Sequence, residues 1–198
     1  MKSLLLALVL LNTPMAFAEV KVGEAAPAFT EKDQAGKSHT LDTHKGKWVV
    51  LEWYNEGCPY VKKQYGSKNM QSLQKTYTGK GVVWLTVATS AEGKQGYVDP
   101  KTAAQHMKDA GMNSTALLLD ADGTMGRTYD AKTTPHMFVI NPTGKVVYAG
   151  AIDSDDSADP KTIATATNYV SQALDLSMAG KPVATASKKP YGCNVKYN

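Results

Sequence analysis

The chain contains two cysteines, and the first of them, Cys58, lies where a thiol can become a nucleophile. It follows an apolar stretch and precedes Pro59, which suits the first turn of a helix because proline has no N–H to pair there. A helix start offers unpaired N–H groups and the positive end of the helix dipole, and both favour a thiolate. Lys62 and Lys63 add positive charge within one turn, whereas Glu56 opposes it. The pattern predicts a reactive Cys58, with a buried structural cysteine as the alternative.

The second cysteine, Cys193, allows three interpretations. A flexible tail could bring its thiol to Cys58 as a resolving thiol. A permanent disulfide would instead close a loop of about 135 residues and stabilise the fold by about 4–5 kcal/mol, and Cys58 could then not react. The third interpretation leaves both thiols unpaired. Two cysteines with dispersed histidines make no recognisable zinc or haem motif, so we expect no metal and no cofactor.

One acidic residue, Glu52, lies six positions before Cys58 within an apolar, strand-like stretch. A carboxylate buried there would have its pKa raised by desolvation, which suits a base that works near neutral pH. The alternative is an acid at the edge of a sheet, facing water. Glu52 is therefore a candidate catalytic residue beside the two cysteines.

Strand-like and helix-like stretches alternate along the chain and must position these residues. We expect strands at 48–54, 81–89 and 115–120, and hairpins around 34–37 and over 136–150. We expect helices from Pro59 to about Tyr77, from Pro100 with Asp99 as its cap, and over 160–179 with Gly180 at its end. The order predicts an α/β fold with a mixed central sheet flanked by helices, an N-terminal hairpin and an extended C-terminal tail.

The motif order resembles a known family. The stretch "VGEAAPAFTEKDQAGKSHTLDTHKGKWVVLEW" is similar to the start of the peroxiredoxin (AhpC/TSA) and periplasmic thioredoxin-like proteins. An apolar strand, Cys-Pro at a helix start and Thr134-Pro135 before a hairpin resemble the thioredoxin-fold redoxins, over about residues 22–175. The tail "KPYGCNVKY" resembles that of exported peroxiredoxin-like proteins with a single active-site cysteine. The resemblance implies a thioredoxin-like fold, a proton-shuttling Glu52, and a cis Pro135 that exposes a backbone edge to substrate.

This sequence matches neither branch of the resemblance completely. Thioredoxins open the helix with Cys-x-x-Cys, but Val61 stands in the second place. Peroxiredoxins carry proline and threonine or serine before the attacking cysteine, where this chain has Leu51 and Asn55. Their arginine near the thiolate has no match at Thr134-Pro135, and the sole arginine, Arg127, comes several residues earlier.

We therefore expect an exported thiol oxidoreductase in which Cys58 attacks a disulfide or a peroxide and Cys193 acts as a possible resolving partner. Its partners would be protein or small-molecule thiols, disulfides or peroxides. The resemblance makes Pro59, Thr134 and Pro135 candidates for substrate contact. The rival hypothesis is a non-enzymatic binding or accessory module in which Cys58 and Cys193 form a structural clamp.

The first 18 residues have the pattern of a secretory signal peptide. Lys2 is followed by the apolar run 4–11 and by Ala16-Phe17-Ala18, a small-x-small cleavage site. We expect cleavage before Glu19, a redoxin domain over 19–180 and a tail over 181–198, in a periplasmic or secreted protein.

Composition narrows the possible partners further. No later stretch is apolar enough to predict a membrane anchor. Lysines are scattered among acids without a basic stripe, which argues against nucleic acid. The acidic stretch 120–123 lacks the full spacing of an EF-hand, and 153–159 is expected to cap the following helix, so calcium is expected at neither.

Overall fold

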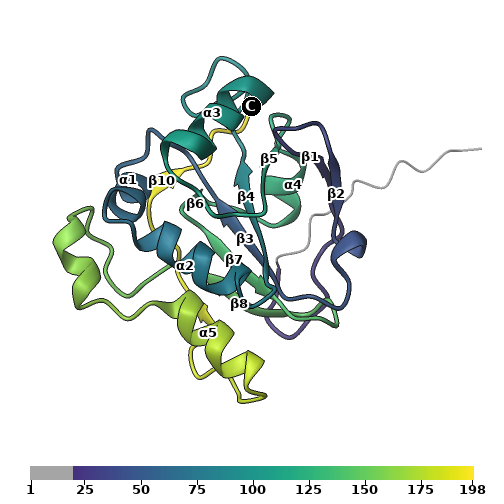
Figure 1. The fold of residues 1–198 in the computed structure, drawn as a ribbon, viewed down its shortest axis with the longest axis vertical. Coiled ribbons are helices and arrows are strands. Elements are labelled where there is room, and N and C mark those ends of the chain that lie inside the picture. The colour runs from purple at the N-terminus through teal and green to yellow at the C-terminus, as the bar shows by residue number, and fades with distance from the viewer. Residues whose placement is uncertain (1–19) are drawn as a thin grey trace, which may run out of the picture.

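The computed structural model describes residues 20–198, built around a mixed six-stranded sheet of order β5-β4-β3-β7-β8-β9 (Figure 1). The expected signal peptide and the cleavage site lie outside the described residues. The strands are β1 (Thr30–Lys32), β2 (Ser38–Thr40), β3 (Val49–Trp53), β4 (Val83–Ala88), β5 (Ala116–Leu119), β6 (Thr133–Thr134), β7 (Met137–Ile140), β8 (Val146–Gly150), β9 (Ser187–Lys188) and β10 (Cys193–Asn194). The helices are α1 (Pro59–Gly66), α2 (Asn69–Thr78), α3 (Pro100–Asp109), α4 (Thr124–Thr128) and α5 (Tyr169–Met178), with 3-10 segments at Asp42–His44 and Pro160–Ala164. Among these helices, none has the length and apolar character needed to cross a bilayer.

The middle of the sheet is apolar on both faces. Strands β3 and β4 are buried throughout and pair in parallel, with Val49 opposite Val83 and Trp53 opposite Val87. Strand β7 pairs with β3 in the antiparallel sense and continues into β8 as a hairpin. Strands that are covered on both faces have continuous apolar sequences, so β3 and β4 could be recognised in the sequence. The predicted mixed sheet and the 136–150 hairpin are confirmed.

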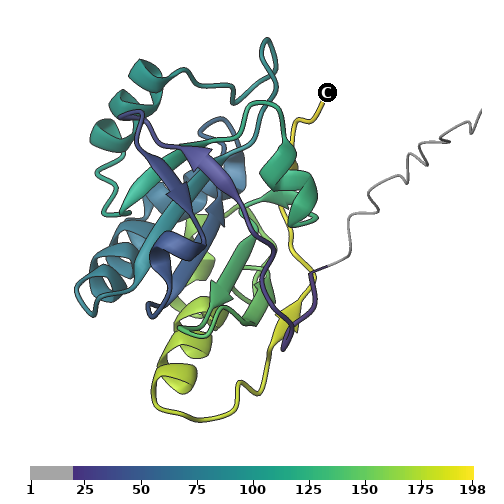
Figure 2. The ribbon, with the colours of Figure 1, turned by 90° about the vertical axis from the view of Figure 1, so that its right-hand side faces the viewer.

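Each face of the sheet packs against its own apolar layer. One layer joins the sheet to α1, α2, α3 and α5 and includes Cys58, Met70, Ala103 and Leu174. The other lies under the β1–β2 hairpin and α4, with Met125 among its buried side chains. Figures 1 and 2 show the hairpin and the larger helices on opposite sides of the sheet. The expected N-terminal hairpin is confirmed.

The helix expected to run unbroken from Pro59 to Tyr77 is in fact two helices. Helix α1 ends at Gly66, Lys68 has a left-handed backbone with φ of 64°, and α2 begins at Asn69. The Ser67 hydroxyl donates to the carbonyls of Lys63 and Gln64, which competes with the continuation of the helix.

The helix expected over 160–179 is also divided. Asp159 caps only the short 3-10 segment Pro160–Ala164, through the N–H of Lys161. Helix α5 begins later, where the Asn168 side chain accepts from the N–H of Ser171. The acidic stretch 153–159 therefore caps the 3-10 segment rather than the long helix, because a second capping residue starts the long helix anew.

The C-terminal tail, expected to have no strand character, pairs with the domain twice. Strand β9 adds to β8 in parallel, and β10 pairs with β6 in the antiparallel sense. Beyond β10, the N–H of Val195 donates to the Lys132 carbonyl and that of Ala91 donates to the Lys196 carbonyl. Figure 2 shows the yellow tail running along one side of the molecule. Strand pairing of such short pieces depends on distant partners, which a local sequence pattern does not reveal.

Candidate active site

Cys58 is the N-cap residue of α1, and Pro59 occupies the first helical position, as the sequence predicted. The chain leaves β3 and turns at Asn55, whose carbonyl accepts from the N–H of Cys58 at 3.0 Å. The thiol is only 1% exposed. Its Sγ donates to the carbonyl of Thr134 at 3.0 Å. The core strand and the helix start together fix the sulfur against the loop before β7.

That loop carries the cis peptide bond expected between Thr134 and Pro135. Both residues are buried, and β6, which contains Thr134, lies beside the start of α1. The carbonyl of Thr134 therefore faces the Cys58 thiol directly. The sequence elements that the resemblance placed together are together in the structure.

Cys193 reaches the same place from the tail. In the β10–β6 pair it lies directly opposite Thr134, whose hydroxyl donates to the Cys193 carbonyl at 3.5 Å. The preceding Gly192 has φ of 134°, and a Cβ there would lie 2.1 Å from the carbonyl oxygen of Thr134. Only glycine allows the tail to approach so closely. Both cysteines are free in the structure, and each lies close enough to the other to influence its pKa.

The two thiols have opposite pKa shifts. Burial alone raises the pKa of Cys58, but hydrogen bonds from the Cys193 thiol, Thr134 and the Val61 N–H outweigh it, so the pKa is lowered. Burial, and then the interaction with Cys58, raise the pKa of Cys193 to about 11. Cys58 is therefore the more acidic thiol of the pair, and it ionises before Cys193.

The lysines expected to support the thiolate do not do so through any contact described for residues 20–198. Lys62 is exposed. Lys63 is buried, and its Nζ donates to the carbonyls of Asp155 and Ser157 at 2.9 Å each, away from the sulfur. Glu56, expected to oppose the thiolate, pairs with His106 at 3.0 Å. Hydrogen bonds rather than neighbouring lysines account for the lowered pKa of Cys58.

Glu52 is buried in the helix-covered layer rather than at a sheet edge. Burial raises its pKa to about 7, against the lowering effect of its hydrogen bonds. These donors are the hydroxyl of Tyr65 at 2.7 Å, the amide of Gln74 at 3.0 Å, the indole of Trp84 at 2.7 Å and the hydroxyl of Thr86 at 3.4 Å. None of the hydrogen bonds described for Glu52 goes to Cys58, so the carboxyl lies behind α1 rather than against the thiol.

The residues at the peroxiredoxin positions are engaged elsewhere. Asn55 exchanges side-chain hydrogen bonds with Gln95 and accepts from the N–H of Gly57. Arg127 donates to the Asp122 carbonyl at 2.7 Å, and its guanidinium lies over the Tyr197 ring. Neither residue directs a donor at the sulfur in the contacts described for them.

His136, next to Pro135, belongs to the opposite side of the sheet. Its ring packs on Phe138, a residue of the apolar layer under the hairpin, whereas Cys58 belongs to the helix-covered layer. Burial lowers the pKa of His136 to about 4, so the ring is neutral at physiological pH. It is a packing residue of the loop.

The sequence analysis did not identify the residues that hold the C-terminal tail against the domain. The Tyr191 ring packs at a tilt against that of Tyr60, with ring centroids 5.7 Å apart, and its hydroxyl donates to Asp153. Lys63 lies over the same ring. The sequence Pro-Tyr-Gly-Cys at residues 190–193 could have indicated them, because a glycine beside a cysteine is typical of a place where two backbones approach closely.

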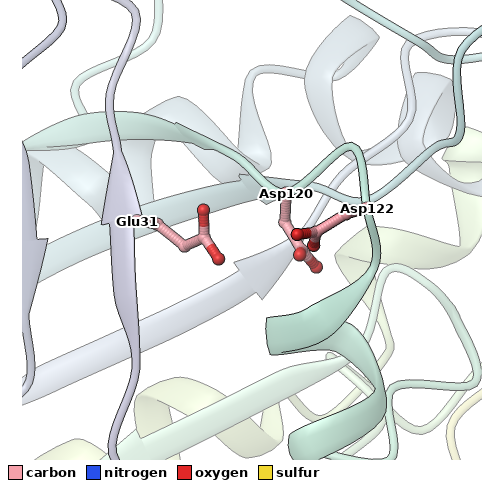
Figure 3. Close-up of side chains that lie close together, drawn as sticks. All are labelled: Glu31, Asp120 and Asp122. Atoms are coloured by element: carbon pink, nitrogen blue, oxygen red, sulfur yellow. The ribbon is translucent and has the colours of Figure 1, made fainter.

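A separate acidic cluster lies at the C-terminal end of β5, between β1 and the loop before α4 (Figure 3). Carboxylate oxygens of Glu31, Asp120 and Asp122 lie within 4.8 Å of one another, a grouping that could hold a cation. Burial and the two aspartates raise the pKa of Glu31 to about 7. Asp120 accepts from the N–H groups of Met125 and Gly126, so it also caps α4. The 120–123 stretch alone could not reveal Glu31, which comes from the hairpin.

Comparison with solved structures identifies the fold. A hypothetical protein from Sinorhizobium meliloti 1021 superimposes with a TM-score of 0.76 at 20% identity, covering 91% of this chain and 97% of that chain. The thioredoxin domain of a thiol-disulfide oxidoreductase from Bacteroides vulgatus gives a TM-score of 0.53 at 21% identity, covering 74% of this chain and 98% of that chain. The predicted thioredoxin-like fold is confirmed.

Comparison of sequences identifies the family. Thiol-disulfide oxidoreductase ResA of Bacillus subtilis (strain 168) is 32% identical over 129 residues, which cover 65% of this chain and 66% of ResA. The profile described as AhpC/TSA family matches residues 22–149. Profile and relative together support the expected thiol-based redox chemistry. With that match over most of its domain, the chain belongs to the AhpC/TSA family.

Proposed function

We propose that this protein is a thiol-disulfide oxidoreductase in which Cys58 is the nucleophile and Cys193 the resolving thiol. The observation that carries the proposal is the meeting of both thiols at Thr134, where the pKa of Cys58 is lowered and that of Cys193 is raised. Cys193, which the tail brings to the site, would replace the second cysteine of the Cys-x-x-Cys motif, where this chain has Val61.

The reaction transfers two electrons. The Cys58 thiolate attacks one sulfur of a substrate disulfide, a mixed disulfide forms, and the other substrate sulfur leaves as a thiolate that takes up a proton. Cys193 then loses its proton and attacks the Cys58 sulfur. The Cys58–Cys193 disulfide forms, and the second substrate thiolate leaves. An external dithiol returns both cysteines to the reduced state by the reverse exchange.

The order of the two steps follows from the charges. While Cys58 is a thiolate, its charge helps to hold the pKa of Cys193 at about 11. In the mixed disulfide that charge is gone, so Cys193 deprotonates more easily when it is needed. The same interaction keeps Cys193 from competing with Cys58 for the substrate.

The remaining site residues have proposed supporting roles. Thr134 and Pro135 present a backbone edge beside the sulfur, and the exposed Pro59 flanks it, so these residues would contact the substrate. Glu52, with a pKa of about 7, changes charge in the working pH range. We assign it to acid–base support of the exchange from behind α1, through its partners there rather than by direct contact.

Disulfides suit this site better than peroxides. Cleavage of a peroxide needs donors fixed around both oxygens as charge develops on the leaving one. Asn55 and Arg127, the nearest equivalents in sequence, are held by Gln95 and by Asp122 and Tyr197. Disulfide exchange needs only an accessible thiolate and a surface for docking.

The direct test compares both reactions in the full mature chain. With a small disulfide as substrate, we expect Cys58 of a Cys193→Ser variant to form a stable mixed disulfide, seen by mass spectrometry. Hydrogen peroxide should oxidise the same thiol more slowly. Rapid sulfenic acid formation with no disulfide exchange would contradict this ranking and favour a peroxidase.

The rival function, an accessory module with a structural clamp, makes a different prediction. A clamp would resist mild reductant until the protein unfolds, whereas a working couple is reduced in the folded state. Thiol titration before and after mild reduction separates the two hypotheses.

We also propose that the protein acts after export, in a periplasmic or extracellular space. The support is the signal-like pattern of residues 1–18 and the placement of both cysteines in the remaining chain. Mass spectrometry of exported material should show an N-terminus at Glu19, and an N-terminus at Met1 would contradict cleavage.

A further inference from the structure

The backbone of the tail lies along the edge of the cis-proline loop. Cys193 is opposite Thr134 and Asn194 is opposite Thr133, which is antiparallel strand addition to β6. On one side of this pair, Gly192 packs on the Thr134 carbonyl. On the other, the N–H of Val195 donates to the Lys132 carbonyl at 3.1 Å. The edge is therefore occupied by the chain itself.

Side chains hold the tail at both ends of this pairing. Before it, the Tyr191 ring contacts the Tyr60 ring and Lys63, and its hydroxyl donates to the buried Asp153. After it, Val195 is 8% exposed, and the Tyr197 hydroxyl donates to the Ala131 carbonyl at 2.7 Å.

The docked tail also covers the nucleophile. Tyr191 and Cys193 pack on the apolar cluster that contains Cys58, and the Cys58 thiol is 1% exposed. A thiol with so little exposure does not meet a substrate until something moves. The tail can move without breaking the central sheet, because β10 is only two residues long, pairs only with β6, and has Asn194 exposed.

We propose that residues 190–195 are a tethered stand-in for an extended, cysteine-bearing polypeptide, and that their release both uncovers Cys58 and frees the β6 edge for a polypeptide substrate. This rests on the proposed function and adds its substrate class and its control. An aromatic residue two positions before the substrate cysteine would take the place of Tyr191 beside Tyr60. A small residue between them would take the place of Gly192.

The test displaces the tail in the full mature chain without removing it. All variants carry Cys193→Ser, so Cys58 is the only thiol. Gly192→Ala forces the tail away from the Thr134 carbonyl, and Tyr191→Ala removes its anchor without touching that carbonyl. Gly180→Ala is the matched control, because it also has positive φ but meets nothing within 4 Å.

Two rates are measured for each variant. The first is alkylation of Cys58 by iodoacetamide, which reports its exposure. The second is capture of a peptide with the sequence of residues 189–196, whose cysteine carries thionitrobenzoate. Cys58 attacks the peptide sulfur, the peptide becomes disulfide-bonded to Cys58, and thionitrobenzoate leaves as a coloured thiolate.

We expect both tail variants to be alkylated about tenfold faster than the parent, because a larger fraction of the molecules has the tail released and Cys58 exposed. Peptide capture should rise by about a further tenfold, because a peptide needs the edge as well as the sulfur. The Gly180→Ala control should match the parent in both rates.

Two outcomes would overturn the proposal. Unchanged alkylation in both tail variants would show that the tail does not cover Cys58. Peptide capture that rises only in step with alkylation would show that the β6 edge takes no polypeptide. Failure of the proposed function looks different: Cys58 would be alkylated normally but would exchange with neither the peptide nor a small disulfide in any variant.

Discussion

Cys58 and Cys193 meet at one residue, Thr134, yet the protein holds them in different ways. Cys58 is built into the core, at the junction of a buried strand and a helix. Cys193 lies in a two-residue strand of a partly exposed tail. The pKa of the first is lowered and that of the second is raised to about 11. In the proposed mechanism, the fixed position holds the attacking sulfur, and the tail supplies the sulfur that acts second.

The largest effect expected from this asymmetry is on turnover. Cys58→Ser should abolish disulfide exchange, because a serine hydroxyl is not ionised at neutral pH. Cys193→Ser should allow the first step and block the second, so a mixed disulfide accumulates. The measurement is reduction of a small disulfide together with intact-mass analysis. Equal residual turnover in both variants would remove the distinction between the two thiols.

A smaller effect is expected on the pKa of Cys58. Cys193→Ala removes the largest of the interactions that lower it, so the pKa should rise. Cys193→Ser keeps a donor at the same place and should change the pKa less. The pH dependence of Cys58 alkylation measures both. An unchanged pKa in the alanine variant would mean that Thr134 and the helix start stabilise the thiolate without Cys193.

The surroundings of Cys58 could be predicted from the sequence, whereas the pairing of the Cys193 tail could not. The strand before Cys58, the proline after it and the order of motifs are local patterns, so the fold and the Cys58–Pro135 arrangement could be predicted. The pairing of Cys193 with Thr134 joins residues 59 positions apart. Two-residue strands have no recognisable period, and their positions depend on packing that only the folded chain provides.

A second difference between expectation and structure concerns Lys63. Lys63 follows Cys58 by five positions and was expected to favour the thiolate. Its Nζ instead joins α1 to the carbonyls of Asp155 and Ser157. A side chain with four methylenes reaches several alternative partners, so sequence proximity does not decide which one it binds.

Behind the core thiol, Glu52 should make stability depend on pH. Its pKa is about 7 in the fold and near 4.5 when exposed, so the unfolded state ionises first as pH rises. Stability should therefore fall between about pH 4.5 and pH 7, by up to about 3 kcal/mol. Denaturant titrations at a series of pH values should show a shallower fall in Glu52→Gln. Parallel curves for the two proteins would contradict the raised pKa.

The smallest effect is expected at Glu31, which none of the described contacts joins to either thiol, and it serves as a reference. Glu31 also has a pKa raised to about 7, by burial and by Asp120 and Asp122. It is partly exposed, so solvent screening should limit the gain from Glu31→Gln to less than about 1 kcal/mol. The gain should appear at pH 8 and vanish at pH 4, where Glu31 is neutral in both states. Disulfide exchange should not change.

The central claim is that Cys58 and Cys193 form one working redox couple in the folded protein. Its most direct test is a redox titration of the mature chain in glutathione buffers, with the disulfide mapped by mass spectrometry and folding followed by circular dichroism. The account predicts a two-electron transition between the dithiol and a Cys58–Cys193 disulfide, reversible without loss of structure. Thiols that never pair, or a disulfide reducible only after unfolding, would contradict it.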